Sequence, residues 1–143
     1  MLLPITLTLA AACALLNLWL ALRCSQLRIA GKVLHGDGGD PRLVRRMRAH
    51  ANFIEYTPIA LILFALIELA LGAALWLWIV ALVYIVSRVA HTLGMDMDRP
   101  NAARAAGITA TWVVLLVLAI AALYAAYSGT RDVPAPAALA AQV

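Results

Sequence analysis

Long uncharged segments are the feature that most limits the possible fold of this chain. Residues 1–22 and 105–127 contain no charged side chain, and residues 73–93 contain one, Arg88. Residues 49–70 are also mainly apolar after a polar start. A helix of ~20 mainly apolar residues crosses the ~30 Å hydrocarbon core of a bilayer. The sequence therefore predicts an all-α integral membrane protein, a bundle of four transmembrane helices at about these positions.

Composition excludes the main alternatives. The chain is 65% hydrophobic and 13% charged, whereas a soluble domain has ~25% charged residues. A small soluble domain leaves much of its surface in water, so a soluble enzyme, a nucleic-acid-binding protein and a disordered chain are excluded. We expect one membrane domain over residues 1–127. The first segment is predicted to be retained, because its apolar run exceeds the ~7–15 residues of a signal peptide. A flexible tail is predicted over 128–143.

Basic residues predict the orientation. The 23–48 segment holds seven of the eleven basic residues, namely Arg23, Arg28, Lys32, Arg42, Arg45, Arg46 and Arg48. The 94–104 segment adds Arg99 and Arg104. Because basic loops are enriched on the cytoplasmic side, we expect both segments in the cytoplasm and both termini opposite. An aromatic belt is predicted at that opposite interface, formed by Trp76, Trp78, Tyr124 and Tyr127.

Two residues of opposite charge, Glu55 and Arg88, lie inside neighbouring predicted spans. Ionisable groups inside a bilayer are costly and usually functional. At a rise of ~1.5 Å per residue, Asn52 lies roughly 6 Å and Glu55 roughly 10 Å deeper than Arg48. Arg88 lies roughly 8 Å below the same interface. The sequence therefore predicts a buried Glu55–Arg88 pair, which either belongs to a ligand site or only ties two helices together.

Polar residues recur at helical spacing on two spans. Steps of three and four place residues on one helix face. One such stripe comprises Arg45, Arg48, Asn52, Glu55 and Tyr56, and the second comprises Tyr84, Arg88, His91 and Met95. Both stripes open toward the basic segments. They suit a small ligand with two carboxylates and an amine, next to a hydrophobic reactant in the lipid.

Further polar residues have individual interpretations. Arg104 directly precedes the fourth span, where a guanidinium and free backbone N–H groups predict an anion site; the alternative is a positive-inside anchor. Arg99 is expected to be neutralised by Asp96 and Asp98. Glu68 is expected to be solvated at the far interface.

Two remaining features carry less chemistry. Asn17 either bonds across helices or joins the polar residues of the other spans. The three histidines are scattered along the chain, and none pairs with a cysteine or an aspartate at metal-ligand spacing, so no metal site is predicted.

The segment from Arg48 to Pro58, RAHANFIEYTP, resembles the signature of the MAPEG family, membrane-associated proteins in eicosanoid and glutathione metabolism. The pattern R-x-x-x-N-x-x-E-[YF]-x-P combines three polar identities inside a membrane span. Arg88, His91 and Arg104 follow in the family's order. The resemblance covers roughly residues 5 to 127 and points to a bacterial-type member similar to microsomal glutathione transferases.

The resemblance implies a homotrimer that binds glutathione, the co-substrate, between neighbouring subunits near the cytoplasmic face. Carried over by position, the glutathione-binding residues are Arg28, Lys32, Arg48, Asn52, Glu55, Tyr56, Arg88 and His91. Arg104 resembles the arginine that stabilises the glutathione thiolate and is the expected catalytic residue, with Arg99 as a rival. A nearby cation favours the thiolate of a thiol whose ordinary pKa is ~8.5.

The expected function is therefore a glutathione-dependent transferase or peroxidase that acts on lipophilic electrophiles. His91 and Met95 stand where several eukaryotic members have tyrosines, which favours general detoxification over eicosanoid synthesis. One alternative is a non-catalytic membrane scaffold or accessory protein that retains the family fold. A small multidrug transporter ranks last, because its first span usually carries an acidic residue and this one has none.

Overall fold

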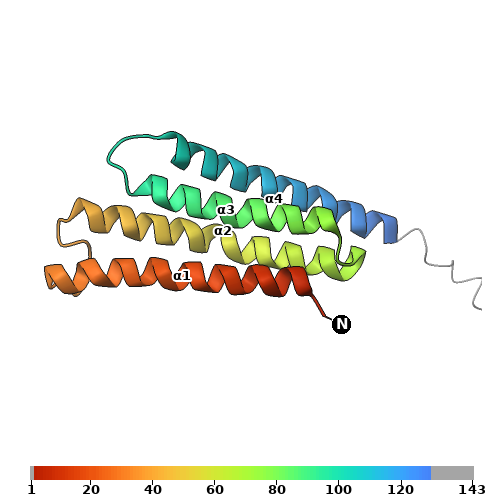
Figure 1. The fold of residues 1–143 in the computed structure, drawn as a ribbon, viewed down its shortest axis with the longest axis horizontal. Coiled ribbons are helices and arrows are strands. Elements are labelled where there is room, and N and C mark those ends of the chain that lie inside the picture. Colours follow the sequence, from red (N-terminus) through yellow and green to blue (C-terminus); the bar gives the residue numbers. More distant parts are fainter. Residues whose placement is uncertain (1, 130–143) are drawn as a thin grey trace, which may run out of the picture.

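The computed structural model describes residues 2–129 and shows a bundle of four antiparallel α-helices (Figure 1). They are α1 (Pro4–Gly31), α2 (Pro41–Leu71), α3 (Leu75–Met95) and α4 (Ala102–Gly129). Each is long and apolar enough to cross a membrane. The predicted all-α four-helix fold is confirmed. Of the predicted tail, residues 128 and 129 belong to α4, and residues 130–143 lie outside the described part of the chain.

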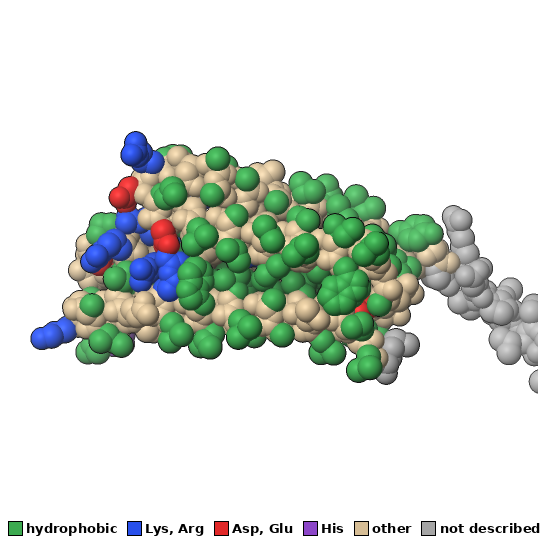
Figure 2. All heavy atoms as spheres, in the orientation of Figure 1, with side chains coloured by type: hydrophobic (Ala, Val, Ile, Leu, Met, Phe, Trp, Pro, Cys, Tyr) green, Lys and Arg blue, Asp and Glu red, His purple; other side chains and the backbone are tan. Residues whose placement is uncertain are grey.

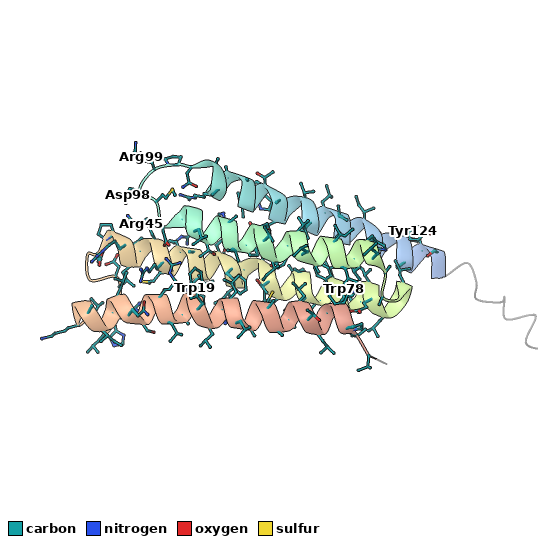
Figure 3. The ribbon with its side chains drawn as sticks, viewed as in Figure 1. Trp19, Arg45, Trp78, Asp98, Arg99 and Tyr124 are labelled. Atoms are coloured by element: carbon teal, nitrogen blue, oxygen red, sulfur yellow. The ribbon has the colours of Figure 1, made fainter. Side chains whose placement is uncertain are left out.

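The α1–α2 and α3–α4 connections lie at one end of the bundle, which we call the basic end (Figure 1). Lys and Arg side chains gather there, and hydrophobic side chains are spread over the rest of the visible face (Figure 2). The α2–α3 turn and the N-terminus lie at the opposite end. Trp78 and Tyr124, two residues of the predicted aromatic belt, lie toward that opposite end (Figure 3).

The helices at the basic end are longer than predicted. Residues 23–48 were expected to form a loop, but α1 continues to Gly31 and α2 begins at Pro41. Most of the basic residues therefore lie on helix ends. The cause is local: the Asp40 side chain accepts the Arg42 backbone N–H at 2.8 Å and caps α2. Hydrogen bonds from Arg42 also hold the pKa of Asp40 below its ordinary value.

The order of packing places α2 and α3 in the centre. α1 packs on α2 and α3, α4 packs on α3 and α2, and within the described residues no Cα atoms of α1 and α4 lie within 8 Å of each other. The core contains fully buried large side chains, among them Phe64, Tyr84, Leu77 and Leu118. Tyr84 meets the edge of the Phe64 ring with centroids 6.4 Å apart. α2 and α3 therefore form the centre of the bundle, and both α1 and α4 pack against them.

Glu68 is buried, and the prediction that it is solvated is wrong. Its side chain is 3% exposed. One carboxylate oxygen accepts the backbone N–H of Ile5 at 2.9 Å, and the other accepts that of Thr6 at 2.8 Å. The first N–H groups of a helix have no partner within the helix, and α1 has no capping side chain of its own. The carboxylate on α2 takes that role and joins the two helices.

Two glycines permit the close approach of α3 and α4 at the basic end. A Cβ atom on Gly94 would lie 2.3 Å from the backbone nitrogen of Arg104. A Cβ atom on Gly107 would lie 2.6 Å from the backbone nitrogen of His91 and 2.7 Å from the carbonyl oxygen of Ser87. Only glycine fits at either position without moving backbone.

We expect Gly107→Ala to lower the stability of the bundle by about 1–3 kcal/mol, because the added methyl group forces α3 and α4 apart. Thermal unfolding in detergent measures the loss. Gly31→Ala is the matched control, since its Cβ would meet only the side chain of Val33, at 3.3 Å. Equal unfolding temperatures for the two variants would contradict this account of the α3–α4 contact.

Candidate ligand-binding site at the basic end

A cavity of about 440 Å³ opens between α2, α3 and α4 at the basic end. The α3–α4 loop, residues 96–101, forms part of its rim. The lining residues are Val44, Arg45, Arg48, Asn52, Tyr56, His91, Met95, Met97, Asp98, Arg104, Ile108 and Trp112. One helix face of each of three helices therefore converges on a single space.

Five of the residues predicted to form the site line this cavity: Arg48, Asn52, Tyr56, His91 and Arg104. They come from the polar stripe of α2, from α3 and from the first turn of α4. The two stripes predicted from helical spacing thus meet at one place. That these residues hold glutathione remains a prediction.

Arg88 is fully buried behind the cavity wall, with 0% of its surface exposed. It donates to Asn52 Oδ1 at 2.8 Å and to Thr111 Oγ1 at 3.4 Å. Its guanidinium carbon lies 5.6 Å from the centre of the Tyr56 ring, a cation–π distance. Arg88 therefore orients two cavity residues, Asn52 and Tyr56, without lining the cavity itself.

The predicted ion pair between Glu55 and Arg88 is wrong for residues 2–129 of a single chain. Glu55 is exposed, and none of the ion pairs among the described residues involves it. Successive residues on a helix point about 100° apart, at 3.6 residues per turn. Tyr56 faces Arg88, so Glu55 is turned away from it. The neutral amide of Asn52 serves as the hydrogen-bond acceptor for Arg88 instead.

Arg104 and Arg99 differ in position. Both residues are exposed, but Arg104 lines the cavity and Arg99 does not. Asn101 caps α4 by accepting the backbone N–H of Arg104 at 2.9 Å, so this N–H is not available to an anion. The Arg104 carbonyl oxygen lies 2.9 Å from Nδ1 of His91. For an anion in the cavity, Arg104 therefore offers its guanidinium group, and its backbone N–H does not contribute to the predicted anion site.

The acidic residues of the α3–α4 loop do not neutralise Arg99, contrary to prediction. Asp96 pairs with Arg23 of α1. An oxygen of Asp98 lies 2.5 Å from Nη1 of Arg45 on α2. Figure 3 shows Arg45, Asp98 and Arg99 at the same end of the bundle. Asp96 and Asp98 pair with arginines of α1 and α2 because the bundle places those guanidinium groups beside the loop.

Two predicted basic residues lie outside the cavity of this chain. Arg28 donates to the sulfur of Met47 at 3.3 Å, and Lys32 is exposed at the end of α1. Asn17 bonds across helices, the first of its two predicted roles, with Oδ1 2.8 Å from Nε2 of His50. None of these side chains is among the cavity residues.

Sequence reasoning missed the apolar wall of the cavity. Ile108 and Trp112 follow Arg104 at steps of four residues, so one face of α4 carries all three. The spacing of four residues from Arg104 could have predicted that both residues line the site. Nε1 of Trp112 donates to the Tyr56 hydroxyl at 3.1 Å and connects α4 to α2 across the cavity.

The cavity is electrostatically asymmetric. Arg45, Arg48 and Arg104 supply three guanidinium groups, and Asp98 supplies one carboxylate. The three ion pairs within residues 2–129 leave Arg48 and Arg104 without a carboxylate partner. Such a site attracts anions and binds carboxylates through charge-assisted hydrogen bonds. In the same part of the chain, no group of three or more His, Cys, Asp or Glu residues is placed to hold a metal.

Residues 6–124 match the MAPEG family. The chain belongs to this family. Two curated relatives, both inner membrane protein YecN, come from Escherichia coli K12 and from Escherichia coli O6:H1 strain CFT073. Each is 34% identical over 116 residues, covering 80% of this chain and 87% of the relative. Together with the four apolar helices, the match shows that this MAPEG protein is a multi-pass integral membrane protein.

We expect Asn52→Ala to destabilise the protein by about 1–3 kcal/mol, because it leaves a buried N–H group of Arg88 without its acceptor. Thermal unfolding of the ligand-free protein measures the effect. Asn17→Ala removes an exposed amide from a cross-helix hydrogen bond and should cost about 0.5 kcal/mol or less. If the two variants unfold at the same temperature, Arg88 does not depend on Asn52.

Proposed function

We propose that this MAPEG protein is a glutathione-dependent transferase or peroxidase that acts on lipophilic electrophiles and serves in detoxification. The observation that carries the proposal is the asymmetric cavity. The guanidinium groups of Arg48 and Arg104, which have no carboxylate partner within residues 2–129, share this cavity between membrane-spanning helices with an apolar wall formed by Ile108 and Trp112. An anionic thiol and an apolar electrophile are the two reactants that such a site brings together.

The polar part of the cavity suits the tripeptide. Glutathione carries two carboxylates, which Arg45 and Arg48 bind as charge-assisted partners. The Asn52 side chain, held by Arg88 at 2.8 Å, offers a fixed polar group to the peptide backbone. Because Arg88 orients both Asn52 and Tyr56, binding requires little reordering of the site, which reduces its entropic cost.

Arg104 is the proposed catalytic residue. A guanidinium beside the thiol favours the thiolate, which is the nucleophile. In the transferase reaction, the thiolate sulfur forms a bond to an electrophilic carbon as the leaving group departs. In the peroxidase reaction, the thiolate sulfur bonds to the terminal oxygen of a hydroperoxide as the O–O bond breaks, which gives a sulfenic acid. The alkoxide leaves and takes a proton from water to become the alcohol, and a second glutathione thiol converts the sulfenic acid to the disulfide and water.

The parts of the predicted site that lie outside the cavity are assigned to a neighbouring subunit. Arg28, Lys32 and Glu55 do not line the cavity of their own chain. In the proposed homotrimer they are available to the site of the adjacent copy. The concentration of Lys and Arg at the basic end (Figure 2) supports a cytoplasmic location for this end and the opposite side for both termini.

Glutathione should raise the thermal stability of the detergent-purified protein. A ligand at 100 times its dissociation constant adds about 2.7 kcal/mol. Bound glutathione should also show the ultraviolet absorbance of a thiolate at neutral pH. S-methylglutathione, which has no ionisable thiol, is the control for the absorbance. If saturating glutathione changes neither quantity and no aryl halide is conjugated, the scaffold or accessory role replaces the enzyme.

We expect Arg104→Ala to abolish most turnover of a generic aryl halide and to remove the thiolate absorbance. Glutathione binding should weaken less, because Arg45 and Arg48 remain. Steady-state kinetics separates kcat from KM. Arg99→Ala is the matched control, since Arg99 is exposed outside the cavity, and should retain wild-type rates. The reverse pattern would assign catalysis to Arg99.

A further inference from the structure

Asp98 has a position that the proposed chemistry does not use. It is the single carboxylate among the residues that line the cavity. Its oxygen lies 2.5 Å from Nη1 of Arg45, the distance of a direct charge-assisted hydrogen bond. In the ligand-free protein, a carboxylate of the chain itself therefore occupies one of the three cavity guanidinium groups.

The α3–α4 loop is anchored on both sides of Asp98. Before it, Asp96 pairs with Arg23. After it, the Asn101 side chain donates to the Gly94 carbonyl oxygen at 2.7 Å and accepts the Arg104 N–H. Between these anchors, the Asp98 side chain is 79% exposed. Asp98 can therefore leave Arg45 without unfolding α3 or α4.

The pairing of Asp98 with Arg45 is weak enough to be exchanged. The Arg45 side chain is 26% exposed and that of Asp98 is largely exposed, so water and salt reach the pair, and ion pairs open to solvent contribute little to stability. A carboxylate that enters the cavity meets three cations, two of which have no carboxylate partner. A first ligand carboxylate can bind there directly, but a second that reaches Arg45 has to replace Asp98.

We propose that Asp98 is a specificity-determining residue that competes with the ligand for Arg45. It lowers the affinity for anions that engage all three arginines, and it is displaced when a ligand with two carboxylates binds. For glutathione this inference rests on the proposed function; for simple dicarboxylates it does not. The chemical class of ligand that it concerns is a small flexible molecule with two carboxylates.

The experiment compares wild-type protein with Asp98→Asn by isothermal titration in detergent at low salt, with glutathione and with glutarate as separate probes. Glutarate carries two carboxylates and no amine or thiol. We expect Asp98→Asn to bind both probes about two- to fivefold more tightly, the range expected from loss of an exposed competing pair. The difference should vanish near 1 M salt, where the screening length falls to ~3 Å.

Asp96→Asn is the matched control. It removes the same charge from the same loop, but Asp96 does not line the cavity and pairs with Arg23. Wild-type affinities are expected for this variant. An equal gain in affinity in both variants would overturn the proposal. The cause would then be the loss of a negative charge anywhere in the loop, or a loosening of the loop.

The remaining outcomes are also decisive. If Asp98→Asn binds glutathione more weakly but glutarate more tightly, the competitor role stands for simple dicarboxylates and is overturned for glutathione, whose ammonium group Asp98 then holds. Unchanged affinities for both probes, or no binding of either probe, would overturn the competitor role. If glutathione fails to bind while glutarate binds more tightly to Asp98→Asn, the competitor role stands and the glutathione function falls.

Discussion

The buried guanidinium of Arg88 is the constraint on which the site depends. A cation with no exposed surface inside a membrane-spanning helix requires partners for its N–H groups. Its two terminal nitrogens find them on both sides, in Asn52 of α2 and Thr111 of α4, whereas Nε has no hydrogen-bond partner among the described residues. The same cation lies near the ring of Tyr56. Burial of one charge thereby fixes the relative positions of three helices and of two residues that line the cavity.

Close packing of α3 on α4 completes the site. Gly94 and Gly107 allow the backbones of α3 and α4 to approach closely near His91 and Arg104. Asn101 caps the N-terminus of α4, so Arg104 lies in the first turn of that helix. The bond between His91 and the Arg104 carbonyl oxygen holds this junction together. The close-packed α3–α4 junction and the anchored α3–α4 loop therefore both border the cavity.

Much of the fold and half of the site could be predicted before the structure was known. Mainly apolar runs of about 20 residues located all four helices, and steps of three and four brought Arg48, Asn52, Tyr56 and His91 together. The predictions that failed concern which residues pair with each other. Depth along the helix paired Glu55 with Arg88, yet rotation about the helix axis separates them. Distance along the chain paired loop acids with Arg99, yet the bundle offers them Arg23 and Arg45.

Hydropathy and helical periodicity are properties of consecutive residues, so the chain alone established a four-helix membrane bundle with its polar residues toward one end. Which charged residues pair with each other depends on which helix faces meet, and the packing of the helices decided that. Glu68 illustrates the difference: it resembles a solvated interfacial acid until α1 is placed beside α2 and presents the N–H groups of Ile5 and Thr6. A charged group in a low-dielectric interior takes the partner that three-dimensional packing supplies.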